Sequence, residues 1–199
     1  MDRLAFRVLV ALVVFGFAAH RFIYLRKVRH PDSAVVEQPP EAAERLKGLL
    51  LILALVVTAA WVAEPVWLRW ASLPSPEWLR WAALCLAVPG FALLQWAQAA
   101  LGRNWSVFVR LLADHQLVRA GPYRWVRHPM YAAALLIHAS VLLLSANWLV
   151  GGLWVGTDVW QFATRIPMEE ALMARQFGDE YRAYTRATGR LVPRLLHRA

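Results

Sequence analysis

Apolar residues along the chain fall into five blocks, separated by charged or proline-containing segments. The blocks cover about residues 4–25, 46–64, 78–100, 129–145 and 148–166. The first three are long enough to supply the roughly 20 apolar residues that a transmembrane helix needs. The last two are somewhat short for a span, and only SANW (145–148) separates them. The pattern predicts an all-α integral membrane bundle of about five transmembrane helices, in which the fourth and fifth form a tight hairpin.

The segment after the fifth block is polar but keeps a helical apolar repeat. Met173, Phe177, Tyr181 and Tyr184 follow one another at spacings of 4, 4 and 3 residues, which places them on one face of a helix. We predict a C-terminal cytoplasmic amphipathic helix, bent at Gly178. It would lie either against the bundle as a lid or on the membrane surface. The whole chain, 1–199, is treated as one membrane domain, with three spans in 1–100 and the chemistry in 101–199.

The basic residues are distributed unevenly between the predicted loops. Eighteen of the 22 Lys and Arg residues lie in 20–48, 101–128 and 165–199, which alternate along the chain and therefore share one side of the membrane. The positive-inside rule assigns that side to the cytoplasm, with the N-terminus outside and the C-terminus inside. Basic residues directly after the first block also favour a retained span over a cleaved signal peptide. The net charge of +9 therefore indicates contact with anionic lipids and no nucleic acid.

Other polar residues in the apolar blocks are few. The single cysteine, Cys85, lies inside an apolar block, and the six histidines show no metal-ligand spacing, so we predict no metal site. A soluble Rossmann methyltransferase is excluded because no glycine-rich strand–turn–helix signal is present. His138 and Asp158 lie within predicted spans, where such groups either form a structural hydrogen bond to another span or line a substrate channel.

The stretch GPYRWVRHPMY (121–131) directly precedes the fourth apolar block. Pro129 is suited to the first position of a helix, which leaves His128 at the helix N-terminus. Unpaired N–H groups and the positive end of the helix dipole favour an anion there. With Arg124 and Arg127 nearby, the stretch predicts an anion-binding site at the cytoplasmic surface. The alternative is a set of interfacial residues that only anchor the span.

A second polar group, RIPMEE (165–170), ends the fifth block. Arg165 and Glu169 are four residues apart and share a helix face. We expect Pro167 to start a new helix, so that Glu169 and Glu170 lie near its positive end. An antiparallel hairpin brings 127–131 and 165–170 together. The result would be a site for a zwitterionic cofactor that meets a lipid-like substrate.

Two long runs carry a resemblance to a known family. HQLVRAGPYRWVRHPMY (115–131) and RIPMEEALMARQFGDEYRAYTRATGRLVP (165–193) resemble the isoprenylcysteine carboxyl methyltransferase family. More broadly they look like the superfamily that includes phospholipid N-methyltransferases. The resemblance covers about residues 100–195. It implies a membrane enzyme that uses S-adenosyl-L-methionine, with a cofactor pocket open to the cytoplasm and a lateral tunnel for a lipidic or prenylated substrate.

The resemblance also implies roles for particular residues. Arg165 would contact the methyl-accepting group, and Arg165 and Glu169 would be the catalytic pair. The implied cofactor contacts are His115, Gln116, Leu117, Val118, Tyr123, His128, Pro129, Met130, Tyr131 and Glu169.

The acceptor is expected to be an isoprenylcysteine-type α-carboxylate, because the Arg165 guanidinium suits a carboxylate better than an amine. A phospholipid amine is the alternative acceptor. Two other functions stay open. One is an isoprenoid or sterol reductase of related fold, although such proteins typically carry RHxNY where this chain has RHPMY. The other is a small transporter.

Overall fold

The computed structural model describes residues 3–27, 41–102 and 117–194. Within these ranges the chain forms helices and no β-strand, which confirms the all-α prediction. The elements are α1 (Arg3–Lys27), α2 (Glu41–Ala63), the 3-10 helix η1 (Pro65–Ala71), α3 (Glu77–Ala82), α4 (Leu84–Leu101), the 3-10 helix η3 (Gly121–Arg124), α5 (Pro129–Ser145) and α6 (Trp148–Ala187).

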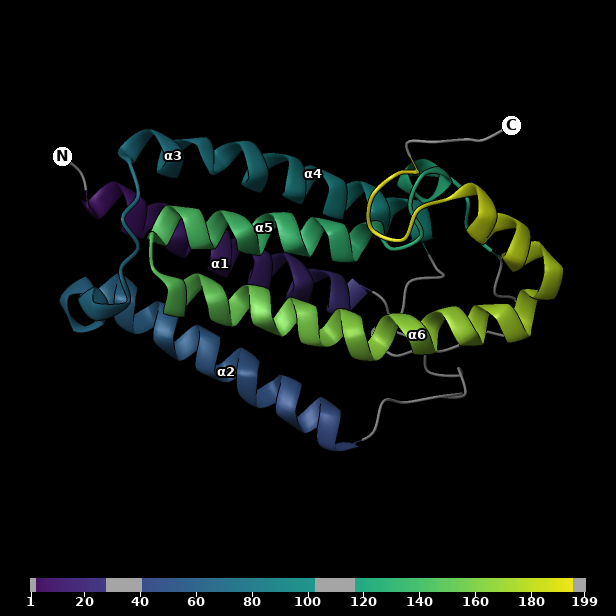
Figure 1. Cartoon of the computed structure of the whole chain (residues 1–199), viewed down its shortest axis with the longest axis horizontal. Helices are drawn as coiled ribbons and strands as arrows, with labels where there is room; N and C mark the ends of the chain where they lie inside the picture. The colour runs from purple at the N-terminus through teal and green to yellow at the C-terminus, as the bar shows by residue number, and fades with distance from the viewer. Residues whose placement is uncertain (1–2, 28–40, 103–116, 195–199) are drawn as a thin grey trace.

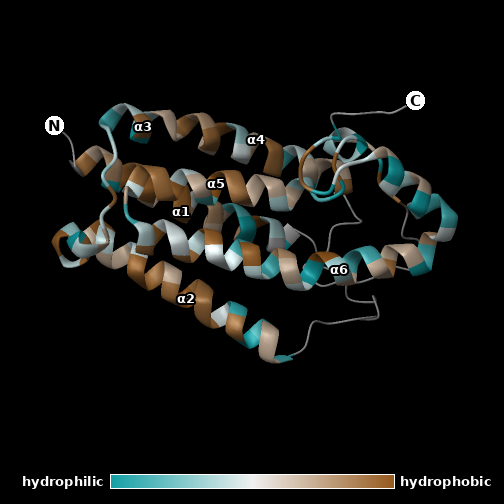
Figure 2. Cartoon of the chain, in the orientation of Figure 1, coloured by the Kyte–Doolittle hydropathy of each residue, from teal (hydrophilic) through white to brown (hydrophobic). Residues whose placement is uncertain are grey.

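The helices form a bundle whose members lie roughly along one direction (Figure 1). Helices α1, α4, α5 and the first part of α6 pack together; α2 packs against α6 toward its C-terminal end, and its N-terminal end diverges from the bundle. Three segments are long and apolar enough to cross a membrane: Leu4–Tyr24, Glu41–Ala63 and Glu77–Leu101. Helix α5 is apolar but shorter, and α6 changes from apolar to polar along its length (Figure 2). The chain is therefore a membrane protein whose polar residues gather at one end of the bundle.

A two-residue turn joins α5 to α6. Ala146 adopts the left-handed conformation (φ 46°, ψ 42°), and the Asn147 side chain accepts hydrogen bonds from the N–H groups of Leu149 and Val150, each at 3.1 Å. Such an N-cap satisfies two of the free donors at the start of α6. The Asn147 amide also donates to the Leu68 carbonyl at 2.8 Å. The turn is thus fixed both locally and by a distant part of the chain.

Helix α6 does not follow the predicted break at Pro167. It continues from Trp148 to Ala187, and its non-helical residue is Gly178 (φ 51°, ψ −122°). A proline inside a helix removes one N–H donor, but the neighbouring hydrogen bonds and packing can hold the helix together. The expectation that Pro167 starts a new helix is therefore wrong, and Glu169 and Glu170 are not at a positive helix end. The bend at Gly178 is confirmed; it turns the last part of α6 back toward the bundle (Figure 1).

The polar side chains of α5 and α6 that face the bundle interior bond to one another. His138 Nδ1 lies 2.8 Å from Asp158 Oδ2, and both side chains are buried. The Trp154 ring stacks on His138 at 4.8 Å, and its indole N–H donates to the Thr58 hydroxyl at 2.9 Å. Of the two predicted roles for His138 and Asp158, the structure supports the hydrogen bond between helices.

Two neighbouring glycines offer a test of how closely α5 and α6 pack. A Cβ added at Gly151 would lie 2.2 Å from the Leu142 Cα, whereas one at Gly152 would meet nothing within 4 Å. We expect Gly151→Ala to lower the free energy of unfolding by about 1–3 kcal/mol, because overpacking forces the helices apart. The matched control Gly152→Ala should melt at or above the wild-type temperature in detergent. Equal melting temperatures for the two variants would contradict the close packing.

Candidate active site

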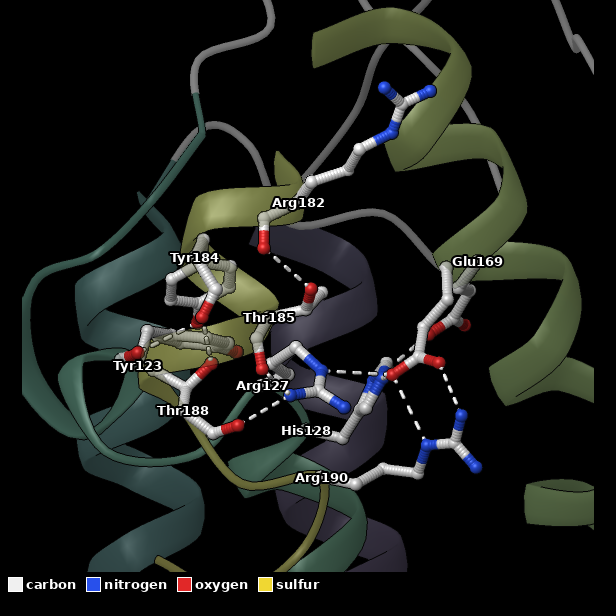
Figure 3. Close-up of polar contacts among 10 residues, drawn as sticks. Tyr123, Arg127, His128, Glu169, Arg182, Tyr184, Thr185, Thr188 and Arg190 are labelled. Atoms are coloured by element: carbon white, nitrogen blue, oxygen red, sulfur yellow. Dashed lines mark hydrogen bonds and ion pairs between the residues drawn. The ribbon is translucent and has the colours of Figure 1, made fainter. Parts of the chain in front are cut away.

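Three segments meet at the polar end of the bundle: the start of α5, the middle of α6 and the residues after α6 (Figure 3). Pro129 is the first residue of α5 and His128 precedes it with extended φ (−124°), as the sequence predicts. Because α5 and α6 run antiparallel from their shared turn, residues 127–131 lie beside residues 165–170. The geometry predicted from the hairpin is therefore present in the structure.

The Glu170 carboxylate is the acceptor that joins these three segments. Its oxygens accept from Arg127 Nε at 2.9 Å and from Arg190 Nη2 at 2.6 Å, and His128 Nε2 lies at 3.3 Å. The Glu170 side chain is 16% exposed. Burial alone would raise the pKa of Glu170, but the bonds from His128, Arg190 and Arg127 lower it well below its usual value. Glu170 is therefore a carboxylate at neutral pH and holds three basic side chains together.

Backbone hydrogen bonds attach the residues after α6 to the segment before α5. The Arg127 N–H donates to the Gly189 carbonyl at 2.9 Å and the His128 N–H to the Arg190 carbonyl at 3.0 Å. The Gly189 N–H donates in turn to the Trp125 carbonyl at 3.0 Å. A Cβ at position 189 would lie 1.7 Å from the Val192 carbonyl oxygen, so only glycine fits this crossing.

The bent end of α6 packs over the same segment. The Tyr184 hydroxyl donates to the Tyr123 carbonyl at 2.7 Å, and both rings are buried. Burial raises the pKa of Tyr184 to about 12, so this hydroxyl stays a donor at neutral pH. Arg127 Nη1 adds bonds to the carbonyls of Thr185 (3.2 Å) and Thr188 (2.5 Å). Of the two predicted placements, the end of α6 therefore lies against the bundle.

A second carboxylate, Glu169, faces the inner side of the site. It accepts from the Tyr131 hydroxyl at 2.6 Å, lies 3.6 Å from His128 Nδ1 and lies 3.8 Å from Arg165 Nε. The His128 and Tyr131 rings stack at 5.6 Å. Burial opposes the charged form of His128, but contacts with Glu169 and Glu170 outweigh it and raise the His128 pKa. The structure thus brings together His128, Tyr131, Glu169 and the almost fully buried Arg165.

The remaining predicted cofactor residues lie around this group. Pro129 and Tyr123 are buried, while Met130, Leu117 and Val118 are partly buried. His115 and Gln116 lie outside the described residues. Among the residues that the structure describes, no group of three or more His, Cys, Asp or Glu side chains is arranged to hold a metal ion.

Arg124 and Arg127, predicted to help form an anion site, have the following partners in the structure. Arg127 is engaged by Glu170 and by two backbone carbonyls. The Arg124 guanidinium lies 3.7 Å from the centre of the exposed Trp125 ring. An anion at this end of α5 would depend on the free N–H groups of its first turn and on the helix dipole.

Polar residues of α1 and α4 also meet near the ends of these helices, and the part played by Tyr24 was not predicted from the sequence. The Tyr24 hydroxyl donates to the Gln98 carbonyl at 2.8 Å. The Gln98 side chain is 0% exposed, and neither its amide oxygen nor its amide nitrogen has a hydrogen-bond partner in the described part of the chain. Polar residues near the ends of otherwise apolar spans were the available signal for this contribution.

Comparisons with known proteins agree with the resemblance found in the sequence. Residues 82–175 match the isoprenylcysteine carboxyl methyltransferase (ICMT) family. The protein-S-isoprenylcysteine O-methyltransferase of Schizosaccharomyces pombe is 33% identical over 113 residues, covering 55% of this chain and 46% of that protein. The protein of the same name from Tribolium castaneum is 29% identical over 112 residues, covering 55% and 40%. The chain thus spans about half the length of these relatives.

A solved structure supports the same fold. The eukaryotic intramembrane Ras methyltransferase ICMT, solved without a monobody, superposes with a TM-score of 0.56 and 24% identity. The superposition covers 77% of this chain and 53% of that protein. The likeness supports the membrane-embedded helical architecture.

The three-way attachment through Glu170 can be tested by removing its charge. We expect Glu170→Gln to lower the free energy of unfolding by about 2–3 kcal/mol, since it weakens hydrogen bonds to three basic groups. Glu180→Gln on the same helix is the control. Its exposed pair with Arg119 at 2.9 Å should contribute less than about 1 kcal/mol. Thermal unfolding in detergent measures both, and equal losses would show that the position of the carboxylate does not matter.

The raised pKa of His128 makes stability depend on pH in a defined direction. A group whose folded pKa exceeds its unfolded value of 6.5 stabilises the fold fully below that pH. The contribution is lost as pH rises through the folded pKa. We therefore expect the melting temperature to fall as pH rises above 6.5, and His128→Asn to reduce that slope. An unchanged slope in the variant would mean that another group titrates.

Proposed function

Given that residues 82–175 match the isoprenylcysteine carboxyl methyltransferase family, we propose that this chain is a membrane-embedded methyltransferase. It transfers a methyl group from S-adenosyl-L-methionine to the α-carboxylate of an isoprenylcysteine-type lipid. The observation that carries the proposal is the cluster of Arg165, Glu169, Tyr131 and His128 at the polar end of an apolar helix bundle. A lipid tail would lie along the bundle while its acidic end reaches this cluster.

The residues at the start of α5 fit such a cofactor by their chemistry. The cofactor carries a carboxylate, an ammonium group and a sulfonium group. The first turn of α5 offers free N–H groups to the carboxylate. Glu169 would accept from a donor group of the cofactor, and the faces of Tyr123 and Tyr131 suit a sulfonium cation. On this proposal His128, Pro129, Met130 and residues 115–118 complete the cofactor contacts.

The proposed reaction requires positioning more than proton transfer. When bound, S-adenosyl-L-methionine would supply a methyl carbon attached to a sulfonium. Attack by the acceptor carboxylate oxygen would form the C–O bond while the electron pair of the S–C bond leaves with sulfur. No proton would have to move. The protein then has to align the two reactants, which in well-oriented systems is worth up to roughly 7–11 kcal/mol. Arg165, 8% exposed, would hold the acceptor carboxylate. Because little water reaches this guanidinium, its charge-assisted hydrogen bonds to the carboxylate would be stronger.

The sidedness of the site follows from charge. Most basic residues fall in segments on the same side as Arg165 and His128, so we propose that the site opens to the cytoplasm, where the cofactor is made. The N-terminus would then lie outside and the C-terminus inside.

The function is tested by separating cofactor binding from methyl transfer. We expect the wild type to bind S-adenosylhomocysteine in calorimetry and to methylate an S-prenylated N-acylcysteine in a labelled-methyl assay. Arg165→Ala should keep its affinity for S-adenosylhomocysteine within about threefold. It should lose on the order of 100-fold in kcat/KM, as the loss of a charge-assisted contact of about 2–3 kcal/mol implies. Arg182→Ala, which removes an exposed pair with Asp179 on the same helix, is the control.

Several outcomes contradict the proposal and point elsewhere. No heat with millimolar S-adenosylhomocysteine, combined with tight binding of NADPH, would indicate a reductase. Labelling of a phospholipid amine in place of the prenylated acid would indicate a phospholipid N-methyltransferase. Full turnover by Arg165→Ala would remove Arg165 from the acceptor site.

A further inference from the structure

The last turns of α1 carry three polar residues on an otherwise apolar span: His20, Arg21 and Tyr24. His20 Nε2 lies 2.9 Å from Gln95 Oε1, and the Tyr24 hydroxyl donates to the Gln98 carbonyl at 2.8 Å. His20 and Tyr24 are four residues apart and so share one helix face, and that face contacts α4. These two bonds fix how α1 is rotated about its own axis.

The rotation turns Arg21 toward α5 and α6. Phe17, four residues before Arg21, lies on the same face, and its ring contacts His138 of α5 at 4.8 Å. Helices α1 and α5 run in opposite directions (Figure 1). Phe17 lies level with His138. Arg21, one turn further along α1, therefore lies one turn nearer to the start of α5, where Tyr131 lies.

The electrostatic neighbours of Arg21 agree with this placement. Arg165 is the strongest charged neighbour, and Tyr131 and Asp158 follow. The Arg21 side chain is partly buried, and within the described ranges it makes no hydrogen bond or ion pair. The one carboxylate among these neighbours, Asp158, is already bonded to His138 at 2.8 Å.

Glu169 lies 3.8 Å from Arg165 Nε, but two guanidinium groups in one poorly solvated site still repel each other, and an anion placed between them lowers that repulsion. A carboxylate is suited to that place, because its two oxygens offer about four lone-pair sites and can accept from two guanidinium groups at once. The pair would come from the first helix and the last helix of the bundle.

We propose that Arg21 is an acceptor-binding residue that holds, together with Arg165, the carboxylate to be methylated. The inference rests on the function proposed above and adds the residue that distinguishes acid from ester. Methylation removes the negative charge, so the product ester can no longer neutralise two guanidinium groups. Arg21 would then favour binding of the substrate acid and release of the product. Because Arg21 precedes the matched residues 82–175, this part of acceptor recognition would come from the N-terminal spans.

The test compares an acid with its own methyl ester. Calorimetry with S-adenosylhomocysteine present measures the affinity of an S-prenylated N-acylcysteine and of its methyl ester for wild type, Arg21→Gln, Arg21→Lys and Arg26→Gln. Arg26 is the matched control on α1: it is exposed, and its guanidinium lies 4.4 Å from the centre of the Phe22 ring. We expect the wild type and Arg26→Gln to prefer the acid by about tenfold or more.

Arg21→Gln should reduce that preference about tenfold and raise KM for the acid, while Arg21→Lys keeps part of it. All variants should bind S-adenosylhomocysteine with wild-type affinity. An unchanged acid preference in Arg21→Gln overturns the role of Arg21 and leaves the proposed function intact. Loss of S-adenosylhomocysteine affinity in both Arg21 variants also overturns it, because Arg21 would then be structural. A wild type that does not prefer the acid instead contradicts the carboxylate acceptor itself.

Discussion

The interaction on which the site depends is the contact of the Glu170 carboxylate with Arg127, His128 and Arg190. These three basic residues come from two segments, 127–128 and 190, that lie about sixty positions apart in the sequence. Without a shared anion, positive charges on them would repel one another. Glu170 lies on the helix that passes between those segments. One carboxylate therefore determines where α5 begins relative to α6 and where the chain returns after α6. The backbone pairing of Arg127 with Gly189 then makes the arrangement rigid.

The two adjacent glutamates of α6 contact different groups because they follow one another on a helix. Successive residues on an α-helix point about 100° apart, so Glu169 and Glu170 cannot face the same way. The Glu170 carboxylate contacts Arg127, His128 and Arg190. Glu169 contacts Tyr131 and Arg165 on the inner side. Glu170 therefore holds the segments before α5 and after α6 together, and on the proposed function Glu169 is the carboxylate that faces the cofactor.

Local patterns in the sequence predicted the parts of the molecule that local physics controls. The apolar block at 129–145 coincides with α5, Pro129 begins that helix, and Gly178 bends α6. The hairpin also predicted that Tyr131 and Glu169 meet. The effect of Pro167 was missed because packing on both sides of a proline decides whether a helix survives it. The pairing of Gly189 with Trp125 was missed because it has no periodicity in the sequence and depends on a contact between distant parts of the chain.

The position of the charges also bears on why such a site lies at the end of an apolar bundle. On the proposed reaction an acceptor anion and a cofactor cation become two neutral products, so their mutual attraction disappears as the bond forms. Attraction of this kind is strong only where water is scarce, and Arg165 is almost fully buried. The same burial makes an unneutralised guanidinium costly, which favours a new acceptor anion over the ester just formed. A site with Arg21 and Arg165 on opposite helices would thus bind reactants for the same electrostatic reason that it releases products.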